Sequence, residues 1–229
     1  MRFDLERSER SGADVVRMSG VCWSYGAGPV LEDIDWRVGE KDRVGIVGVN
    51  GAGKSTLVKL ITGQLDPSQG SVFVGPSVRI GVLTQHIWPP GANPADRLID
   101  RFRSQVVMEQ GEARNYLARF LFFGDKVFQR MDSLSGGEQM RLRLAQLMQQ
   151  DVNTLVLDEP TNHLDIESRE VLEGVLEEFA GTLLVVSHDR YFLNRHVTLI
   201  DWLDSGRLTR YEGRYDEVRA IRSADGKTP

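Results

Sequence analysis

The chain has 229 residues, of which 41% are hydrophobic and 27% are charged, and its net charge is −5. This length and composition allow a sizeable buried core and exclude wholesale disorder, while the acidic balance argues against coating nucleic acid through bulk positive charge. The single cysteine, Cys22, excludes an intrachain disulfide framework, and no apolar run approaches the roughly 20 residues that span a bilayer. We therefore expect a cytoplasmic protein without membrane insertion, although contact with a membrane partner stays open.

The first predicted elements are strands. Residues 15–23 and 30–38 alternate apolar and polar side chains, which predicts two antiparallel strands with one exposed face. Residues 43–47 form a short apolar run that ends in a glycine-rich loop, and apolar residues at helical spacing follow that loop. Further short strands are expected at 72–74 and 80–84.

The second half of the chain predicts an α/β core. The strand signal disappears from residue 88 to residue 150, where helical patterns predict an inserted helical subdomain. Apolar strands return at 154–157 and 182–187, and a helix is expected between them at 166–179. Solidly apolar strands are typical of parallel strands that are buried on both faces. The expected fold is therefore α/β, with an antiparallel sheet, a mixed or parallel core sheet and the helical insertion.

The ends of the chain carry weaker patterns. Residues 1–14 are mostly charged and predict a lead-in or the end of a linker, and residues 219–229 predict a C-terminal tail. The single domain is expected at 15–218. Arginines at 207–222 are mixed with acidic and aromatic side chains, and we interpret them first as a solvated face.

A phosphate-binding loop is predicted where the third strand meets the first helix. Residues 48–55 read Gly-Val-Asn-Gly-Ala-Gly-Lys-Ser, which fits the G-x-x-x-x-G-K-[ST] pattern. Backbone N–H groups of such a loop surround phosphates, Lys54 would reach the β- and γ-phosphates, and the Ser55 hydroxyl would bind Mg²⁺. The alternative is a glycine-rich turn without nucleotide, which the strand–loop–helix context disfavours. The expected nucleotide-binding residues here are Gly48, Asn50, Gly51, Gly53, Lys54, Ser55 and Thr56.

Two adjacent carboxylates end the apolar strand at 154–157. Beside a phosphate loop, Asp158 would hold Mg²⁺ and Glu159 would accept a proton from the attacking water. We expect the two side chains to point opposite ways, because successive strand residues do so. The alternative is a helix cap or turn, since Asp-Glu-Pro often ends an element.

A third motif precedes the helix that begins near Glu138. Leu-Ser-Gly-Gly-Glu at residues 134–138 offers free backbone N–H groups and a serine hydroxyl at a helix start, which suits an anion. In isolation it would be interpreted as a capping turn. Together with the two preceding motifs it resembles the signature sequence of ATP-binding-cassette (ABC) proteins, which are P-loop NTPases. The resemblance implies that Ser135, Gly136, Gly137 and Glu138 contact the ATP of a partner cassette.

The resemblance extends from about residue 15 to residue 218 and implies further roles. Tyr25 matches the aromatic residue that stacks on adenine, and Gln85 matches the glutamine that senses Mg²⁺ and the γ-phosphate. Asp165 matches a dimer-contact aspartate, and His188 matches the histidine that contacts the γ-phosphate. Each residue alone has a simpler interpretation: a packed aromatic for Tyr25, a solvated loop residue for Gln85 and a helix cap for His188.

Several segments resemble the ABC-F subfamily in particular. They are Glu-Pro-Thr-Asn-His-Leu-Asp at 159–165, Ser-His-Asp-Arg-Tyr-Phe-Leu at 187–193, Tyr-Glu-Gly-Arg-Tyr at 211–215 and the stretch 116–124. ABC-F proteins are ATPases, many of which bind the ribosome and modulate translation or confer antibiotic resistance. They usually have two cassettes, and this chain resembles the second, C-terminal one.

The resemblance implies a mechanism and leaves alternatives open. ATP with Mg²⁺ would be held between two cassettes that pair head to tail, and hydrolysis would let them part. The expected partners are a second cassette and the ribosome or its RNA. The alternatives are the ATP-binding subunit of a membrane transporter, which shares every catalytic motif, and a module that holds ATP without hydrolysing it.

Overall fold

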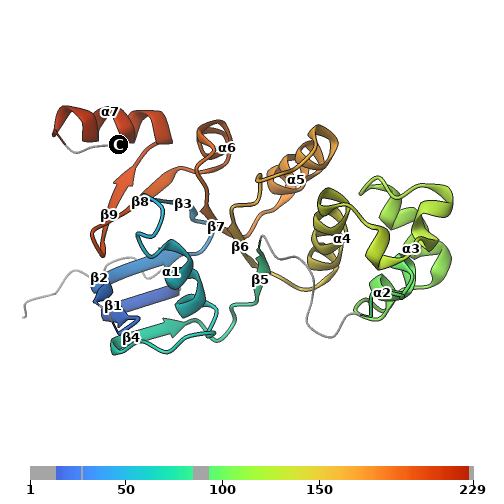
Figure 1. Ribbon diagram of the computed structural model, residues 1–229, viewed down its shortest axis with the longest axis horizontal. Helices are drawn as coiled ribbons and strands as arrows, with labels where there is room; N and C mark the ends of the chain where they lie inside the picture. The colour runs from blue at the N-terminus through green and yellow to red at the C-terminus, as the bar shows by residue number, and fades with distance from the viewer. Residues whose placement is uncertain (1–13, 27, 85–92, 227–229) are drawn as a thin grey trace, which may run out of the picture.

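The computed structural model describes residues 14–26, 28–84 and 93–226. In Figure 1 two sheets lie side by side, and a group of helices extends away from the core sheet. The antiparallel sheet has the order β2-β1-β4, and the core sheet has the order β5-β6-β7-β3-β8-β9. The expected α/β architecture is therefore confirmed.

The antiparallel sheet consists of β1 (Asp14–Ser24), β2 (Pro29–Gly39) and β4 (Gln69–Val74). From Ile34 to Val38 alternate residues of β2 are buried, as the alternating pattern predicts. In β1 the adjacent residues Val15 and Val16 are both buried, and shifts in its register with β2 interrupt the alternation. Asp14 already belongs to β1, so this strand includes one residue before the predicted domain boundary.

The core sheet is parallel except at one edge. Strands β5 (Ile80–Leu83), β6 (Thr154–Asp158), β7 (Thr182–Val186), β3 (Arg43–Val47) and β8 (Leu199–Asp204) pair in parallel. Strand β9 (Arg207–Glu212) closes this edge in antiparallel orientation. The first four residues of β6 and all of β7 are buried, which explains their continuous apolar character. This arrangement brings the carboxyl ends of β3, β6 and β7 to one edge of the sheet.

The helical insertion lies to the right of the core sheet in Figure 1. It contains α2 (Leu98–Arg103), α3 (Gln110–Ala118), α4 (Gly136–Gln149) and short 3-10 turns at Gly124–Phe128 and Met131–Ser133. Between residues 93 and 150 the structure has no strand, only an isolated bridge between Arg97 and Arg130. Buried residues such as Phe102, Leu117 and Phe122 join these helices to α4.

The remaining helices are α1 (Lys54–Ile61), α5 (Ile166–Glu178), α6 (Arg190–His196) and α7 (Tyr215–Ala224). Helix α7 overturns the predicted tail, because it runs past residue 218 and buries Val218 and Arg222. The Arg222 guanidinium lies 4.2 Å from the centroid of the Trp202 ring. The interpretation of 207–222 as a solvated face was therefore wrong in part. The apolar stem of a long arginine side chain can pack against apolar surface, and the charge of the residue gives no sign of this in the sequence.

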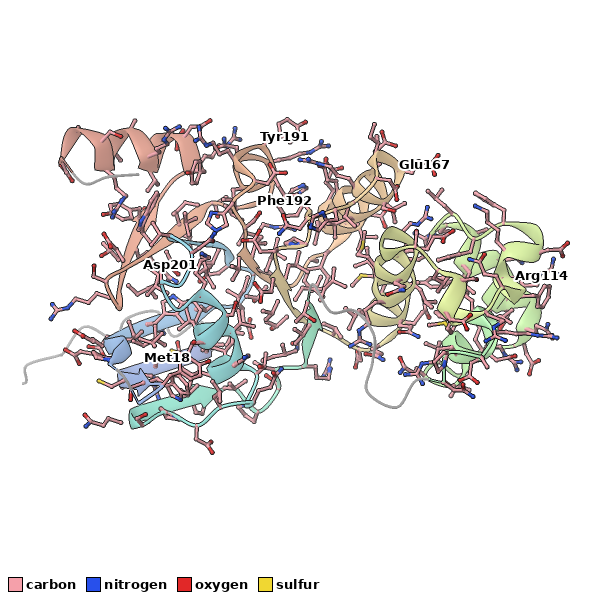
Figure 2. All side chains as sticks on the ribbon, in the orientation of Figure 1. Met18, Arg114, Glu167, Tyr191, Phe192 and Asp201 are labelled. Atoms are coloured by element: carbon pink, nitrogen blue, oxygen red, sulfur yellow. The ribbon has the colours of Figure 1, made fainter. Side chains whose placement is uncertain are left out.

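A buried carboxylate connects the two sheets. Asp201 of β8 is fully buried (labelled in Figure 2) and accepts a hydrogen bond of 2.6 Å from the indole nitrogen of Trp36 on β2. The guanidinium of Arg210 donates two further bonds to it, each of 2.7 Å. A carboxylate that is buried with this many charge-assisted bonds is fully satisfied, and the removal of one partner leaves the others unpaired.

We expect Asp201→Ala to lower the free energy of unfolding by about 3 kcal/mol, because Trp36 and Arg210 lose their buried acceptor. Urea unfolding followed by tryptophan fluorescence measures the change. Asp66→Ala is the control, since that carboxylate is exposed and contributes at most about 1 kcal/mol. Equal losses in both variants would contradict the role given to the buried network.

Candidate functional site

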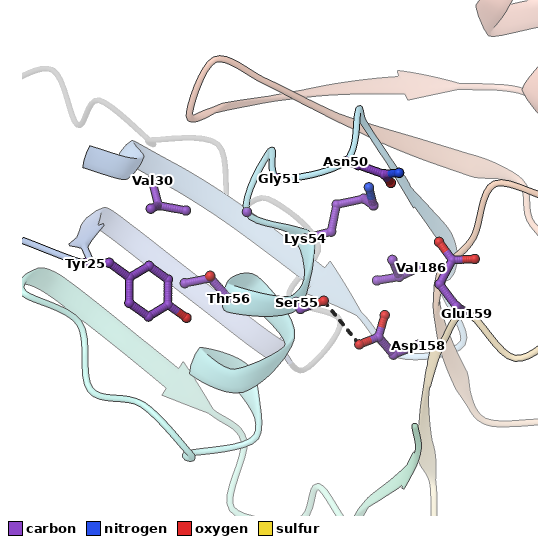
Figure 3. Close-up of a pocket in the computed structure, with 11 residues that line it drawn as sticks. Tyr25, Val30, Asn50, Gly51, Lys54, Ser55, Thr56, Asp158, Glu159 and Val186 are labelled. Atoms are coloured by element: carbon purple, nitrogen blue, oxygen red, sulfur yellow. Dashed lines mark hydrogen bonds between the residues drawn. The ribbon is translucent and has the colours of Figure 1, made fainter. Parts of the chain in front are cut away.

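A cavity of about 340 Å³ opens at the carboxyl ends of the core strands. Figure 3 shows that the loop before α1 and the end of β6 face each other across it. Most of the predicted nucleotide-binding residues line this cavity, although Gly48 does not. The lining consists of Tyr25, Val30, Asn50, Gly51, Gly53, Lys54, Ser55, Thr56, Asp158, Glu159 and Val186.

The loop before α1 has the geometry of an anion-binding turn. Gly53 adopts φ +107°, which side chains rarely tolerate, so the final turn into α1 requires glycine. The Lys54 ammonium donates to the carbonyl oxygens of Gly48 at 2.7 Å and Val49 at 3.0 Å. Burial lowers the pKa of Lys54, while the nearby carboxylates of Glu159 and Asp158 act in the opposite direction. The helix start, the loop and the lysine together form a concave positive site that suits phosphates.

A second part of the cavity carries oxygen ligands. The Ser55 hydroxyl donates to the Asp158 carboxylate across 3.3 Å, shown as the dashed line in Figure 3. Burial raises the pKa of Asp158, and the bond from Ser55 and the charge of Lys54 partly offset this effect. A hydroxyl and one carboxylate are the protein donors that Mg²⁺ typically uses beside substrate phosphates, so these residues fit that ion. Among the described residues, no group of three or more histidine, cysteine or acidic side chains could hold a metal.

The backbone conformation that places Glu159 at the cavity differs from the extended strand that the sequence predicts. Strand β6 ends at Asp158, and Glu159 has φ +50°, in the left-handed region. Its backbone N–H donates to the carbonyl oxygen of Val186 at 2.8 Å. The turn after the strand therefore directs both carboxylates into the same cavity, so the expected alternation does not apply to this pair. The interpretation of this segment as a turn is thus correct for its backbone.

The surroundings of Glu159 suit a proton acceptor. Its carboxylate lies 3.5 Å from the Nε2 atom of His188. Burial raises the pKa of Glu159, the charge and backbone of His188 lower it, and Asp158 raises it further. A carboxyl group with a raised pKa is a stronger base, which is the property that general-base chemistry requires. His188 does not line the cavity but contacts the residue that does.

Tyr25 stands at the rim of the cavity, and its side chain is 62% exposed. The Trp23 ring lies edge-on to it, with 4.0 Å between ring centroids. This contact holds the tyrosine in place and leaves it accessible to a planar ligand. Gln85, the other predicted sensor, lies outside the described residues. Val30 and Val186 also line the cavity; no motif marks them, because only the strand order places them there.

The signature residues form a capping box at the start of α4. The Ser135 hydroxyl accepts from the Glu138 N–H at 3.2 Å, and the Glu138 carboxylate accepts from the Ser135 N–H at 3.0 Å. The alternative of a capping turn is therefore correct for the local structure. None of the four residues Ser135 to Glu138 lines the cavity that contains Lys54.

Asp165 caps the next helix and adjoins the signature. Its carboxylate accepts from the Ser168 N–H at 2.7 Å and from the Ser168 hydroxyl at 2.9 Å. The bond from the Ser168 N–H is the main reason that the pKa of Asp165 is lowered. A Cβ atom on Gly137 would lie 2.4 Å from the Asp165 carboxylate and 2.5 Å from the Ser168 hydroxyl. The starts of α4 and α5 thus pack together through a glycine.

We expect Gly137→Ala to lower the free energy of unfolding by about 1–2 kcal/mol, because the added methyl group displaces the cap of α5. Gly136→Ala is the matched control, since a Cβ there meets nothing within 4 Å. It should leave stability unchanged or raise it by up to about 1 kcal/mol through helix propensity. Urea unfolding compares the two, and equal stability would argue against the close packing.

Comparison with known proteins gives three findings. The family model described as ABC transporter matches residues 31–162, which is more than half of the chain. The protein YdiF of Bacillus subtilis is 41% identical over 216 residues, covering 93% of this chain and 33% of that protein. The "Energy-dependent translational throttle protein EttA" of Haemophilus influenzae is 38% identical over 219 residues, covering 91% of this chain and 38% of that protein. The chain thus spans about a third of the length of these relatives.

Solved structures agree on the fold. The structure of cbiO1 from Clostridium perfringens, described as part of the ABC transporter complex cbiONQ, has a TM-score of 0.71 with 22% identity and covers 92% of each chain. Within the part of the chain that the structure describes, no helix is both long enough and apolar enough to cross a bilayer. The family match and the phosphate-loop residues that line the cavity together show that the chain belongs to the ABC transporter family, as an ATP-binding cassette.

Proposed function

We propose that this cassette forms one half of a two-cassette ATPase that closes head to tail on Mg²⁺-bound ATP and reopens after hydrolysis. One observation carries the proposal: Lys54, Asp158 and Glu159 share a cavity that the signature helix start does not reach. A helix N-terminus with a serine hydroxyl suits the anionic γ-phosphate, so a second cassette can complete the site with its own signature. ATP would then join the two halves, and loss of the γ-phosphate would remove that contact.

Each predicted residue receives a role in this closed state. Glu159 takes the proton of the attacking water, and His188, within 3.5 Å of it, contacts the γ-phosphate and orients the carboxylate. Tyr25 stacks on adenine, and Asp165 adjoins the partner. The phosphates are held by the loop that begins at Gly48 and by Lys54.

Magnesium is the proposed cofactor of the site. Ser55 and Asp158 would hold it, because their oxygens already lie 3.3 Å apart on the same side of the cavity, and Gln85 would complete the set. When bound, the ion neutralises negative charge on the phosphates. Lys54, which precedes Ser55 on α1 and also lines the cavity, adds a second positive charge.

We further propose an ABC-F role in the cytoplasm, acting on the ribosome. The motif around Asn162 and His163 supports the subfamily, and so does the name of the relative EttA, a translational throttle protein. The chain spans only about a third of the length of such relatives. The second cassette and the ribosome are therefore proposed as partners of this cassette.

Sedimentation velocity tests the closure. The Glu159→Gln variant with Mg²⁺ and ATP is expected to form a dimer that disappears when ADP replaces ATP. The same experiment on Lys54→Ala should show only monomers, because nucleotide binding is lost. A Glu159→Gln protein that stays monomeric at high concentration with saturating ATP, although it binds the nucleotide, would refute pairing between copies of this cassette.

Co-sedimentation tests the cellular target. The Glu159→Gln variant, saturated with ATP, is mixed with purified ribosomes in one experiment and with membrane vesicles that contain native membrane proteins in another. The proposal predicts ATP-dependent recovery with the ribosomes. Recovery with the vesicles alone would favour the transporter subunit. Lys54→Ala serves as the control in both mixtures, since an ATP-dependent interaction requires the nucleotide.

A further inference from the structure

A network of ion pairs joins α5 to the loop that carries His188. The Arg169 guanidinium on α5 forms an ion pair with the Asp189 carboxylate, with 3.0 Å from Nη1 to the nearest oxygen, and its Nε donates to the Glu173 carboxylate at 2.9 Å. It also covers the ring of Tyr191, with 5.4 Å to the ring centroid. Figure 2 labels Glu167 on α5 and Tyr191 on α6, the two neighbouring helices that this arginine connects.

Asp189 is held from both sides in this arrangement. One carboxylate oxygen accepts from the Phe192 N–H at 3.0 Å and so caps α6, while the other receives the Arg169 contact. The Asp189 N–H donates to the Ser187 hydroxyl at 3.0 Å, and Ser187 is fully buried. The backbone on either side of His188 is therefore anchored, at Ser187 by burial and at Asp189 by Arg169.

His188 depends on this anchoring more than a core residue would. Its side chain is 48% exposed, so packing alone does not fix the ring that lies 3.5 Å from Glu159. An exposed side chain takes its direction mainly from its backbone and its hydrogen-bond partners. A change at Asp189 would therefore move the imidazole relative to the carboxylate.

Arg169 also stands one helical turn after Asp165. Its N–H donates to the Asp165 carbonyl oxygen at 3.0 Å, and the Asp165 side chain caps the same helix. A displacement of the start of α5 would thus reach Asp189 through a single side chain. Asp165 is the residue to which the proposed function assigns the contact with the partner cassette.

We propose that Arg169 is a positioning residue: through Asp189 it holds His188 against Glu159 and links the start of α5 to the site of hydrolysis. This inference rests on the proposed function, because it assumes that His188 and Glu159 act on ATP. The competing explanation is that Arg169 only stabilises the surface, where ion pairs contribute little. The network itself supplies a control, since Arg195 donates to the same Glu173 at 2.7 Å and to Glu177 at 2.6 Å without contacting Asp189.

Kinetics separate the two explanations. Arg169→Met keeps the apolar stem and removes the charge, and we expect kcat for ATP hydrolysis to fall about tenfold while KM changes less than about twofold. Arg195→Met should leave kcat unchanged. Asp189→Asn should match Arg169→Met, and the double variant should be no slower than either single one, because both remove the same contact. Equal kcat in Arg169→Met and wild type, or additive losses in the double variant, would overturn the proposal.

NMR of the nucleotide-free protein tests the positioning of His188 without ATP hydrolysis. The chain has 4 histidines, so the ring resonances of His188 can be assigned by substitution and followed by NMR in the nucleotide-free protein. Arg169→Met should shift and broaden them, Arg169→Lys should restore them only in part because lysine lacks the planar fork, and Arg195→Met should leave them in place. Unchanged His188 resonances in Arg169→Met would refute the positioning role. Wild-type hydrolysis by Glu159→Gln would instead refute the proposed function.

Discussion

Glu159→Gln is expected to lower the rate of ATP hydrolysis at least about 100-fold while ATP still binds, because the amide cannot accept the proton of the attacking water. The substitution preserves the shape of the side chain and its place beside His188. Phosphate release under saturating ATP measures the rate, and fluorescence of a bound nucleotide analogue measures affinity.

The pH dependence provides a second signature of the same residue. A general base acts in its deprotonated form, so the wild-type rate should rise with pH as Glu159 loses its proton. Burial raises the pKa of Glu159 above the ordinary value of 4.5, so the midpoint of this limb should lie above that value. The limb should be absent in Glu159→Gln.

The same pKa shift predicts the stability of the variant. A carboxyl group whose pKa is raised on folding binds its proton more tightly in the native state, so its charge opposes folding as the pH rises above 4.5. Glu159→Gln should therefore unfold no earlier than wild type at neutral pH. Glu170→Gln is the matched control, because that exposed carboxylate on α5 should affect neither rate nor stability. A wild-type rate in Glu159→Gln would contradict the assignment of the base.

Lys54→Ala is expected to weaken ATP binding at least about 100-fold, or about 2.7 kcal/mol. The ammonium is the buried positive charge of the cavity and holds the loop through the carbonyl oxygens of Gly48 and Val49. Its removal takes away both the charge opposite the phosphates and the contacts that keep the loop curved. Isothermal titration calorimetry with Mg²⁺-bound ATP measures the loss.

Lys59→Ala provides the control on the same helix. Lys59 is exposed and does not line the cavity, so its removal should change affinity less than about twofold. An unchanged affinity in Lys54→Ala would show that the nucleotide binds elsewhere. Equal losses in both variants would indicate that affinity depends only on the overall charge of α1.

Local patterns in the sequence were enough to predict several strands, loops and helix starts of this molecule. The continuous apolar runs identified the two central strands, since a strand buried on both faces excludes polar residues. The loop before Lys54 and the Ser135–Glu138 capping box are set by neighbouring residues, because their hydrogen bonds span only a few positions. Short-range contacts of this kind can be predicted from the spacing of glycine, serine and charged residues along the chain.

Long-range placement depended on packing. Ser55 and Asp158 are 103 residues apart and meet only because β3 and β6 lie on either side of β7. Local patterns likewise did not predict the left-handed backbone at Glu159 or the burial of Arg222 against Trp202. The physical reason is that the free energy of the whole fold decides these features. The order of the strands, the turn after a strand and the covering of apolar surface by an arginine stem all depend on residues that are distant in the sequence, so no short segment determines them.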